Sequence, residues 1–465
     1  MSYECFSQFQ ASAEWNAQRL LSQLSRQRYL STVDGSLLPD AHAHFEALTG
    51  PLELAELDKT ALAAYDSLPP PFNIREELRK IEFHPMALFL DDDEEEDLKE
   101  NLWSGLNGFT QYAKLDGFYK VQAFNATVSH GLTRVTYDDY HLLTTAVTLP
   151  DGCTTRAECD YHALAPERVI DANDNTQEAL YEPSGHPLAT SFFGTENGAD
   201  IGFKPLSEHQ RPDDPSPGAA IDNPIDALDK AASVLRKDLH SWMGTLGGSA
   251  SPCPDSQAQW IAQGYVLPTL HIRASARQRL TRLKARTAAE QTLLELIRST
   301  PREPVHSLVL TADDYPEAEN GQQIQMQLTC IDGFGRTLQT KQLVEPGMAY
   351  VVNASGELEL DPQTGKPKES HAALRWRVSE RVEYNNKGLA VRVYRPYFAN
   401  AYRYINDQSF SQFGYHDQQF YDPLGRPVQV ISAKGYVSRE SHHPWYQTSE
   451  DFNDTYEPVP DEHLL

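Results

Sequence analysis

The sequence is poor in cysteine, in basic residues and in long apolar runs, and each shortage excludes a class of protein. Its 465 residues include only 5 cysteines, a small and odd number that excludes a disulfide scaffold and predicts free thiols. The 40 Lys and Arg residues stand against 66 Asp and Glu residues, a net charge of −26, so neither nucleic acid nor an anionic membrane is an expected partner. No stretch reaches the roughly 18 consecutive apolar residues of a membrane span.

The sequence also lacks the common catalytic and cofactor motifs. It has no Walker loop, no Gly-x-Ser-x-Gly, no Gly-x-Gly-x-x-Gly and no His-Glu-x-x-His. Residues 171–175 and Glu182 place oxygens at calcium-loop spacing, but Thr176 stands where that loop needs glycine, which favours a β-turn. We therefore expect no enzyme activity, no metal and no cofactor.

Small clusters of polar residues have ordinary interpretations. His42 and His44 have no further ligands at zinc spacing, and neither does the pair at 442–443. Cys153 and Cys159 lie across a predicted turn and are expected to be free thiols. The acidic run at 91–97 (DDDEEED) is expected to form a solvated loop, because seven like charges cannot pack together.

Differences in local residue composition and pattern divide the chain into four stretches. We expect a mixed helical and irregular segment at 1–105, β-hairpins at 106–205, a linker with a helical insertion at 206–302, and a β region at 303–465. The two β stretches alternate short Val-, Thr- and Tyr-rich segments with Gly, Asp and Asn turns. Individual predictions are an exposed linker at 206–222 and helices at 12–30, 52–66, 224–246 and 269–299.

One turn layout occurs four times: an aromatic or apolar residue, an acid or amide, two variable residues, and a glycine before the next strand. The side chain of the acid or amide caps such a turn, and glycine accepts the positive φ that the turn needs. The four turns contain the candidate site residues Tyr181, Gly185, Asp332, Gly335, Arg336, Tyr384, Gly388, Tyr421, Asp422, Gly425 and Arg426. Hairpins of this kind stack on their neighbours, which predicts a long, curled antiparallel sheet rather than a compact enzyme fold.

Several of these segments resemble one family. The stretch YDPLGRPVQVISAKGYVSRESHHPWYQTSEDFNDT is similar to the C-terminal part of the B component of bacterial insecticidal toxin complexes, the TcB type of Tc toxins. IDGFGRTLQTKQLVEPG and RVEYNNKGLAVRVYRPYFAN resemble upstream signatures of that component, and the turns resemble Rhs/YD repeats. The resemblance covers residues from about 110 to 465, and the signatures follow the family's order.

The resemblance implies a mainly β fold with helical insertions, in which a curled Rhs/YD-type sheet forms part of a hollow shell. Family B components build that shell together with a C-type Rhs partner, and it encloses a cytotoxic segment of the partner. They are about three times longer and carry a propeller ahead of this region. This chain is therefore expected to be the shell part alone, from a separate reading frame or a truncated gene, with the propeller part encoded elsewhere.

Other interpretations remain open from sequence alone. Trp376, Tyr394, Tyr397 and Trp445 are aromatic residues of the kind that bind sugars, so a secreted or surface carbohydrate- or protein-binding module is the alternative, although strand spacing favours a role in the core. A hydrolase with dispersed carboxylates and a non-functional toxin fragment are further possibilities. The first ten residues lack the pattern of a Sec signal, so we expect location in the bacterial cytoplasm and later release by a non-Sec route.

Overall fold

The computed structural model describes residues 25–39, 42–86, 102–246, 253–316, 322–353, 356–405 and 414–456. The chain forms two compact units, Met1–Glu178 and Ala179–Leu465, which are described separately. The four stretches proposed from sequence texture are not tested by this division and stay a prediction. The acidic run at 91–97 lies outside the described residues.

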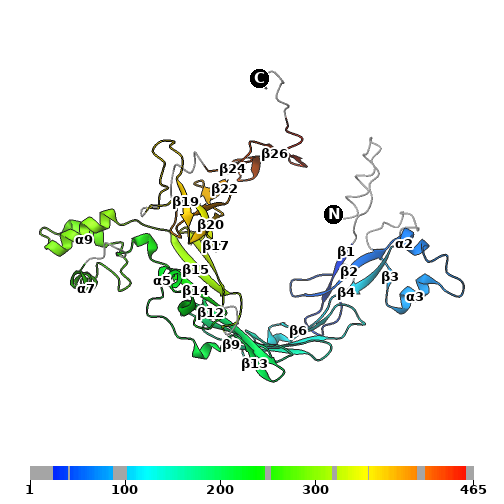
Figure 1. The fold of residues 1–465 in the computed structure, drawn as a ribbon. Helices are drawn as coiled ribbons and strands as arrows, with labels where there is room; N and C mark the ends of the chain where they lie inside the picture. The colour runs from blue at the N-terminus through cyan, green and yellow to red at the C-terminus, as the bar shows by residue number, and fades with distance from the viewer. Residues whose placement is uncertain are drawn as a thin grey trace, which may run out of the picture. The chain divides into compact units, whose positions relative to one another are not determined.

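The first sheet of unit 1 has four antiparallel strands in the order β1-β2-β4-β3 (Figure 1, blue). The strands are β1 (Ser25–Leu30), β2 (Leu48–Leu57), β3 (His84–Pro85) and β4 (Trp103–Asn107), and the helices between β2 and β3 are α2 (Lys59–Ala63) and α3 (Ile74–Lys80). The two helices bury Leu62 and Leu78 beside Trp103, which makes a small core for this sheet.

Two helix predictions for this part of the chain need correction. The helix expected at 12–30 is wrong over its described part, because β1 pairs with β2 and its Arg26 forms an ion pair with the buried Glu53. Residues 12–24 lie outside the described residues. The helix expected at 52–66 is reduced to α2, which begins where the Asp58 side chain caps the backbone N–H of Ala61 at 2.8 Å.

The second sheet of unit 1 is a meander in which each strand pairs antiparallel with the next. Its strands are β5 (Phe109–Tyr112), β6 (Val121–Asn125), β7 (Thr133–Tyr137), β8 (Thr144–Thr148), β9 (Thr154–Asp160), β10 (Ala165–Ile170) and β11 (Thr176–Tyr181), with the 3₁₀ helix η1 (Leu115–Gly117) before β6. No residue of β8 to β11 is fully buried. This part of the sheet is therefore a single layer, held by cross-strand pairs rather than by a core.

Unit 2 contains a larger sheet in which β12, β14, β15, β16, β17, β20 and β23 pair in that order. Its strands are β12 (Pro187–Glu196), β13 (Ala199–Gly202), β14 (Ser233–Asp238), β15 (Val305–Ala312), β16 (Ile324–Ile331), β17 (Thr337–Val344), β18 (Gly347–Tyr350), β19 (Glu369–Ala372), β20 (Arg375–Ser379) and β23 (Tyr397–Ala399). Alternate residues of β15 and β16 are buried, so one face of this sheet carries a core that includes Leu308, Leu310 and Leu328.

Some helices of unit 2 contribute to the core of the sheet, and others form a separate helical core (Figure 1, green). They are η2 (Leu206–Glu208), α5 (Pro217–Asp222), α6 (Pro224–Leu228), η3 (Ser241–Met243), α7 (Pro254–Ala262), α8 (Ala276–Arg282) and α9 (Ala288–Ser299). Trp260, Leu280 and Leu293 belong to a second core shared by α7, α8 and α9. Within the described ranges, no helix is long and apolar enough to cross a membrane.

Three predictions for this stretch differ from the structure. The expected linker at 206–222 contains α5, whose Ala220 and Ile221 are buried in the sheet core. The helix expected at 224–246 ends after α6, because Asp229 and Lys230 have positive φ values of 42° and 66°. The chain then enters the buried strand β14. The helix expected at 269–299 is two helices, α8 and α9.

The last sheet has six antiparallel strands in the order β21-β22-β24-β25-β26-β27. They are β21 (Val382–Tyr384), β22 (Ala390–Tyr394), β24 (His416–Tyr421), β25 (Pro427–Ile431), β26 (Val437–His442) and β27 (Gln447–Glu450). Tyr394 is the single fully buried residue among these strands. Like strands β8 to β11 of unit 1, this sheet is one layer thick.

Candidate functional site: a ladder of capped turns and tyrosines

The turn at Asp332 shows how the repeated layout works. The backbone N–H of Asp332 donates to the carbonyl of Arg336 at 3.0 Å, and that of Gly335 donates to the carbonyl of Asp332 at 3.1 Å. The Asp332 carboxylate accepts from the N–H groups of Phe334 and Arg336 at 2.8 and 3.0 Å. Four hydrogen bonds thus close a five-residue turn. The same four bonds form at Asn385 and at Asp422.

Glycine occupies the position with positive φ in each of these turns. The φ values are 78° at Gly335, 81° at Gly388 and 86° at Gly425, and Gly185 has 80° in the turn that follows Tyr181. Residues with a Cβ are strained in this region of conformational space. Every glycine among the candidate site residues therefore has a backbone reason for being there.

The turn after Tyr181 keeps the backbone pattern but uses its acid differently. The N–H of Glu182 donates to the carbonyl of His186 at 2.9 Å, and that of Gly185 donates to the carbonyl of Glu182 at 2.8 Å. The Glu182 carboxylate forms an ion pair with Lys237 of β14. This turn is thereby tied to a neighbouring strand.

In two of the turns an arginine completes the cap. Arg336 Nε donates to Asp332 Oδ2 at 2.7 Å, and Arg426 Nε donates to Asp422 Oδ2 at the same distance. Backbone and side-chain hydrogen bonds from Arg426 lower the pKa of Asp422. Burial raises the pKa of Asp332, but the bonds from Arg336 outweigh it and the pKa falls below its ordinary value. Both carboxylates are therefore charged at neutral pH.

Two of the tyrosines that precede the turns, Tyr384 and Tyr421, join their hairpin to the one before it. The Tyr384 hydroxyl donates to the carbonyl of Thr337 in β17 at 2.9 Å, and the Tyr421 hydroxyl donates to the carbonyl of Ala390 in β22 at 2.8 Å. The Arg336 guanidinium lies 4.4 Å from the centroid of the Tyr384 ring. In unit 1, Tyr137 donates to the carbonyl of Val121 in the same way, at 2.9 Å. The repeated Tyr and turn form a ladder along the sheets.

Further turns of this type lie outside the four that share the layout identified from the sequence. Ser432 closes one with the same backbone bonds, and its hydroxyl accepts from the N–H of Tyr436 at 3.0 Å. Asp171 closes another, in which Asp174 takes the glycine position with a φ of 61°. The β-turn interpretation of residues 171–175 is therefore confirmed. A pattern that allowed Ser as the cap and Asp or Asn in place of glycine would have found both.

The structure also places the other residues that the sequence offered as candidate sites. No group of three or more His, Cys, Asp and Glu side chains converges as a metal site within the described residues. Cys153 and Cys159 are free. Of the aromatic residues considered for sugar binding, Trp376, Tyr394 and Tyr397 are 1, 3 and 8 % exposed, so they are core residues, while Trp445 is 94 % exposed.

The fold and the ladder define a class of protein: a mainly β chain with helical insertions, whose antiparallel sheets are built from hairpins with capped turns. No protein-family model and no curated protein matches the chain. Solved structures do match it. In the crystal structure of TcdB2–TccC3–Cdc42, the similarity covers 95 % of this chain and 20 % of that chain, with 27 % identity and a TM-score of 0.71.

Two further structures agree. TcdB2–TccC3 without its hypervariable C-terminal region gives 28 % identity and a TM-score of 0.71, over 93 % of this chain and 20 % of that chain. The Tc holotoxin pore of Photorhabdus luminescens gives 27 % identity and a TM-score of 0.71, over 93 % and 19 %. The chain is thus similar to a TcB-type region of Tc toxins, and both the resemblance and the fold class are confirmed. It spans about a fifth of the solved chains that it matches.

Proposed function

We propose that the chain is a structural component of a Tc-type toxin complex. With a C-type Rhs partner it forms the wall of a cavity that encloses a cytotoxic cargo. The observation that carries the proposal is the similarity over 93–95 % of the chain to structures of TcdB2 with TccC3. The proposed role is mechanical, so no catalytic step is assigned to this chain.

The two one-layer sheets support a role as a wall. Strands β8 to β11 have no fully buried residue, and the sheet β21-β22-β24-β25-β26-β27 has none apart from Tyr394, so these strands are not halves of a packed core. Their stiffness comes from capped turns and from tyrosine hydroxyls that join successive hairpins. A thin, stiff sheet suits an enclosure, because it covers area with few residues.

The proposal also explains why a partner is expected. The four-stranded and six-stranded sheets end in edge strands, such as β1 and β27, and edge strands associate with other chains unless something covers them. We therefore expect the chain alone to oligomerise or to be poorly soluble. Production in the bacterial cytoplasm and release with the assembled complex are part of the proposal.

The direct test is co-expression with a C-type Rhs protein from the same genome, followed by size-exclusion chromatography with light scattering. We expect a one-to-one complex that remains soluble where the chain alone does not. The matched control is an unrelated Rhs protein of similar size. A chain that is folded and monomeric and does not bind its C-type partner would contradict the proposal.

A further inference from the structure

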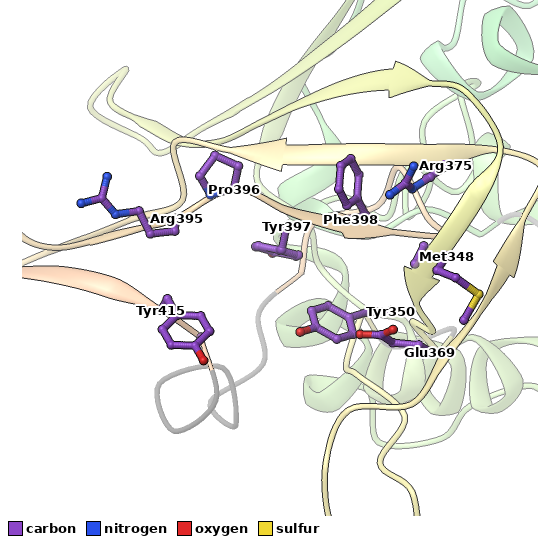
Figure 2. A pocket seen from close by; sticks show the side chains of 11 residues that line it. Met348, Tyr350, Glu369, Arg375, Arg395, Pro396, Tyr397, Phe398 and Tyr415 are labelled. Carbon is purple, nitrogen blue, oxygen red and sulfur yellow. The ribbon is translucent and has the colours of Figure 1, made fainter. Parts of the chain in front are cut away.

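A cavity of about 330 Å³ lies in unit 2, where the ends of β18, β19, β20 and β23 come together (Figure 2). Its lining combines aromatic rings, a methionine and two guanidinium groups with a single carboxylate, that of Glu369. Met348, Phe398 and Tyr415 are 51, 36 and 75 % exposed, so a molecule from outside can reach the apolar part of the lining.

Arg375 is the cation that the cavity holds in place. Its Cζ lies 3.5 Å from the centroid of the Phe398 ring, so the guanidinium is stacked on that face. Gly347 leaves room for it, since an added Cβ there would come within 2.9 Å of Arg375 Nη1. Packing on both sides thus fixes the position of the group before any ligand arrives.

No described residue compensates the charge of Arg375. Its Nε is buried and has no hydrogen-bond partner among the described residues, and no carboxylate in that part of the chain forms an ion pair with it. Arg395, the other arginine of the lining, donates to both carboxylate oxygens of Asp417 at 2.8 Å. Figure 2 shows the Glu369 carboxylate beside the Tyr350 ring rather than beside Arg375. A held guanidinium without an acceptor is suited to an incoming carboxylate.

We propose that this cavity binds an extended peptide segment of a partner protein, one that presents a carboxylate to Arg375 and an adjacent aromatic side chain to Phe398 and Tyr415. Tyr, Phe, Met and Arg are the residues enriched where proteins bind proteins. A sugar site needs several carboxylates or side-chain amides to bind hydroxyl groups, and this lining offers one carboxylate and no Asn or Gln. In a chain of charge −26, one uncompensated cation gives an acidic segment a defined place to bind.

The test uses the full chain and a fluorescent synthetic peptide, Gly-Ser-Glu-Phe-Glu-Phe-Gly-Ser, with a second peptide in which Gln replaces Glu. Fluorescence anisotropy should show binding of the Glu peptide that weakens with added salt. Arg375→Gln should weaken it at least tenfold, and Arg375→Lys by less, because lysine keeps the charge but not the planar stacking. Arg377→Gln is the matched control, since Arg377 is exposed on the same strand and does not line the cavity.

Circular dichroism and thermal unfolding verify that each variant is folded. Equal binding by the Arg375→Gln and Arg377→Gln variants would overturn the proposal, as would equal binding of the Glu and Gln peptides. Arg375-dependent binding of tetragalacturonate in place of the peptide would assign the cavity to acidic glycans instead. Binding that appears only after removal of residues 457–465 would make the chain's own tail the occupant. The variants are compared in one kind of preparation, either the full chain alone or its complex with the C-type partner. A loss confined to Arg375→Gln therefore tests the cavity and not the proposed assembly.

Discussion

Glu53 shows how one buried residue organises the first sheet. Its side chain is fully buried, and it accepts hydrogen bonds from Arg26 Nε at 2.7 Å and Ser104 Oγ at 2.8 Å, while His84 Nε2 lies 2.6 Å away. These partners come from β1, β4 and β3, so one carboxylate on β2 joins all four strands. Burial raises the pKa of Glu53, but the hydrogen bonds from these partners outweigh it and hold the pKa below its ordinary value.

Replacing Glu53 by Gln should cost about 3 kcal/mol of unfolding free energy, because it leaves buried cations without their charge partner. Glu56→Gln, an exposed position on the same strand, should change it by less than about 0.5 kcal/mol. Since the folded pKa is depressed, the stabilisation is full above the unfolded value of 4.5 and is lost as pH falls through the lower folded value. Urea unfolding of both variants measures the difference, and equal losses would contradict this role.

Lys341 is a buried cation in the core of unit 2. Its Nζ donates to the carbonyls of Ala401 and Arg403 and so anchors the segment that follows β23. Burial lowers its pKa to about 8 from 10.5. Between these values the unfolded chain binds more protons than the folded one, so the free energy of unfolding should rise with pH. Above about pH 9 Cys330 acts in the opposite direction, because burial raises its pKa to about 12.

In the Lys341→Met variant the free energy of unfolding should no longer rise with pH in this range. In the wild type Lys341 alone should raise the free energy of unfolding by about 0.7–1.2 kcal/mol per pH unit between pH 8 and 9, below the limit of about 1.4. The opposing effect of Cys330 begins in the same range and should reduce the net slope to about 0.6 kcal/mol per pH unit. The exposed Lys368→Met variant should keep the wild-type slope. Urea unfolding at closely spaced pH values gives all three curves. Parallel curves for the wild type and Lys341→Met would show that Lys341 is not the titrating group.

At the scale of single elements, two turn glycines form a matched pair. Gly388 and Gly435 have φ values of 81° and 86°, so alanine is similarly strained at both. A Cβ at Gly435 meets open space, but one at Gly388 would lie 2.6 Å from Arg336 Nη1. Arg336 cannot move away freely, because it is bonded to Asp332 and stacked on Tyr384.

Gly388→Ala should therefore destabilise the protein by about 1 kcal/mol more than Gly435→Ala, which costs about 1–2 kcal/mol for the backbone strain alone. Thermal and urea unfolding measure the two costs. Both glycine variants are also made in a protein that carries Arg336→Ala. The difference between them should vanish there, because the contact between the added Cβ and Arg336 is gone. A difference that survives there would place its cause elsewhere.

The sequence could predict those elements whose structure depends on residues close together in the chain. The turn at Asp332 is closed by hydrogen bonds between residues within five positions, so its local sequence determines its geometry. Strand β14 is different, because Val234 and Arg236 are strand residues by virtue of pairing with β12 and β15, which lie far away in sequence. The same long-range pairing makes a strand of β1. The cavity at Arg375 could not be predicted either, since four separate strands supply its walls.

At the scale of the whole molecule, the chain corresponds to about a fifth of the solved chains that it matches. Its one-layer sheets bury little within themselves, so they gain stability from neighbours along the sheet. The proposed function therefore belongs to the assembly rather than to any one group of residues. In the proposed assembly, loss of a single turn should weaken the wall locally, and loss of the C-type partner should remove the function altogether.

The most direct measurement is protease protection of the partner's C-terminal segment in the purified one-to-one complex. If the two chains enclose a cavity, that segment should survive digestion in the complex and be degraded at once when the complex is unfolded in urea. Negative-stain images of the same sample should show a hollow particle. A segment that is digested equally fast in the intact complex, or a solid particle, would contradict the proposed enclosure.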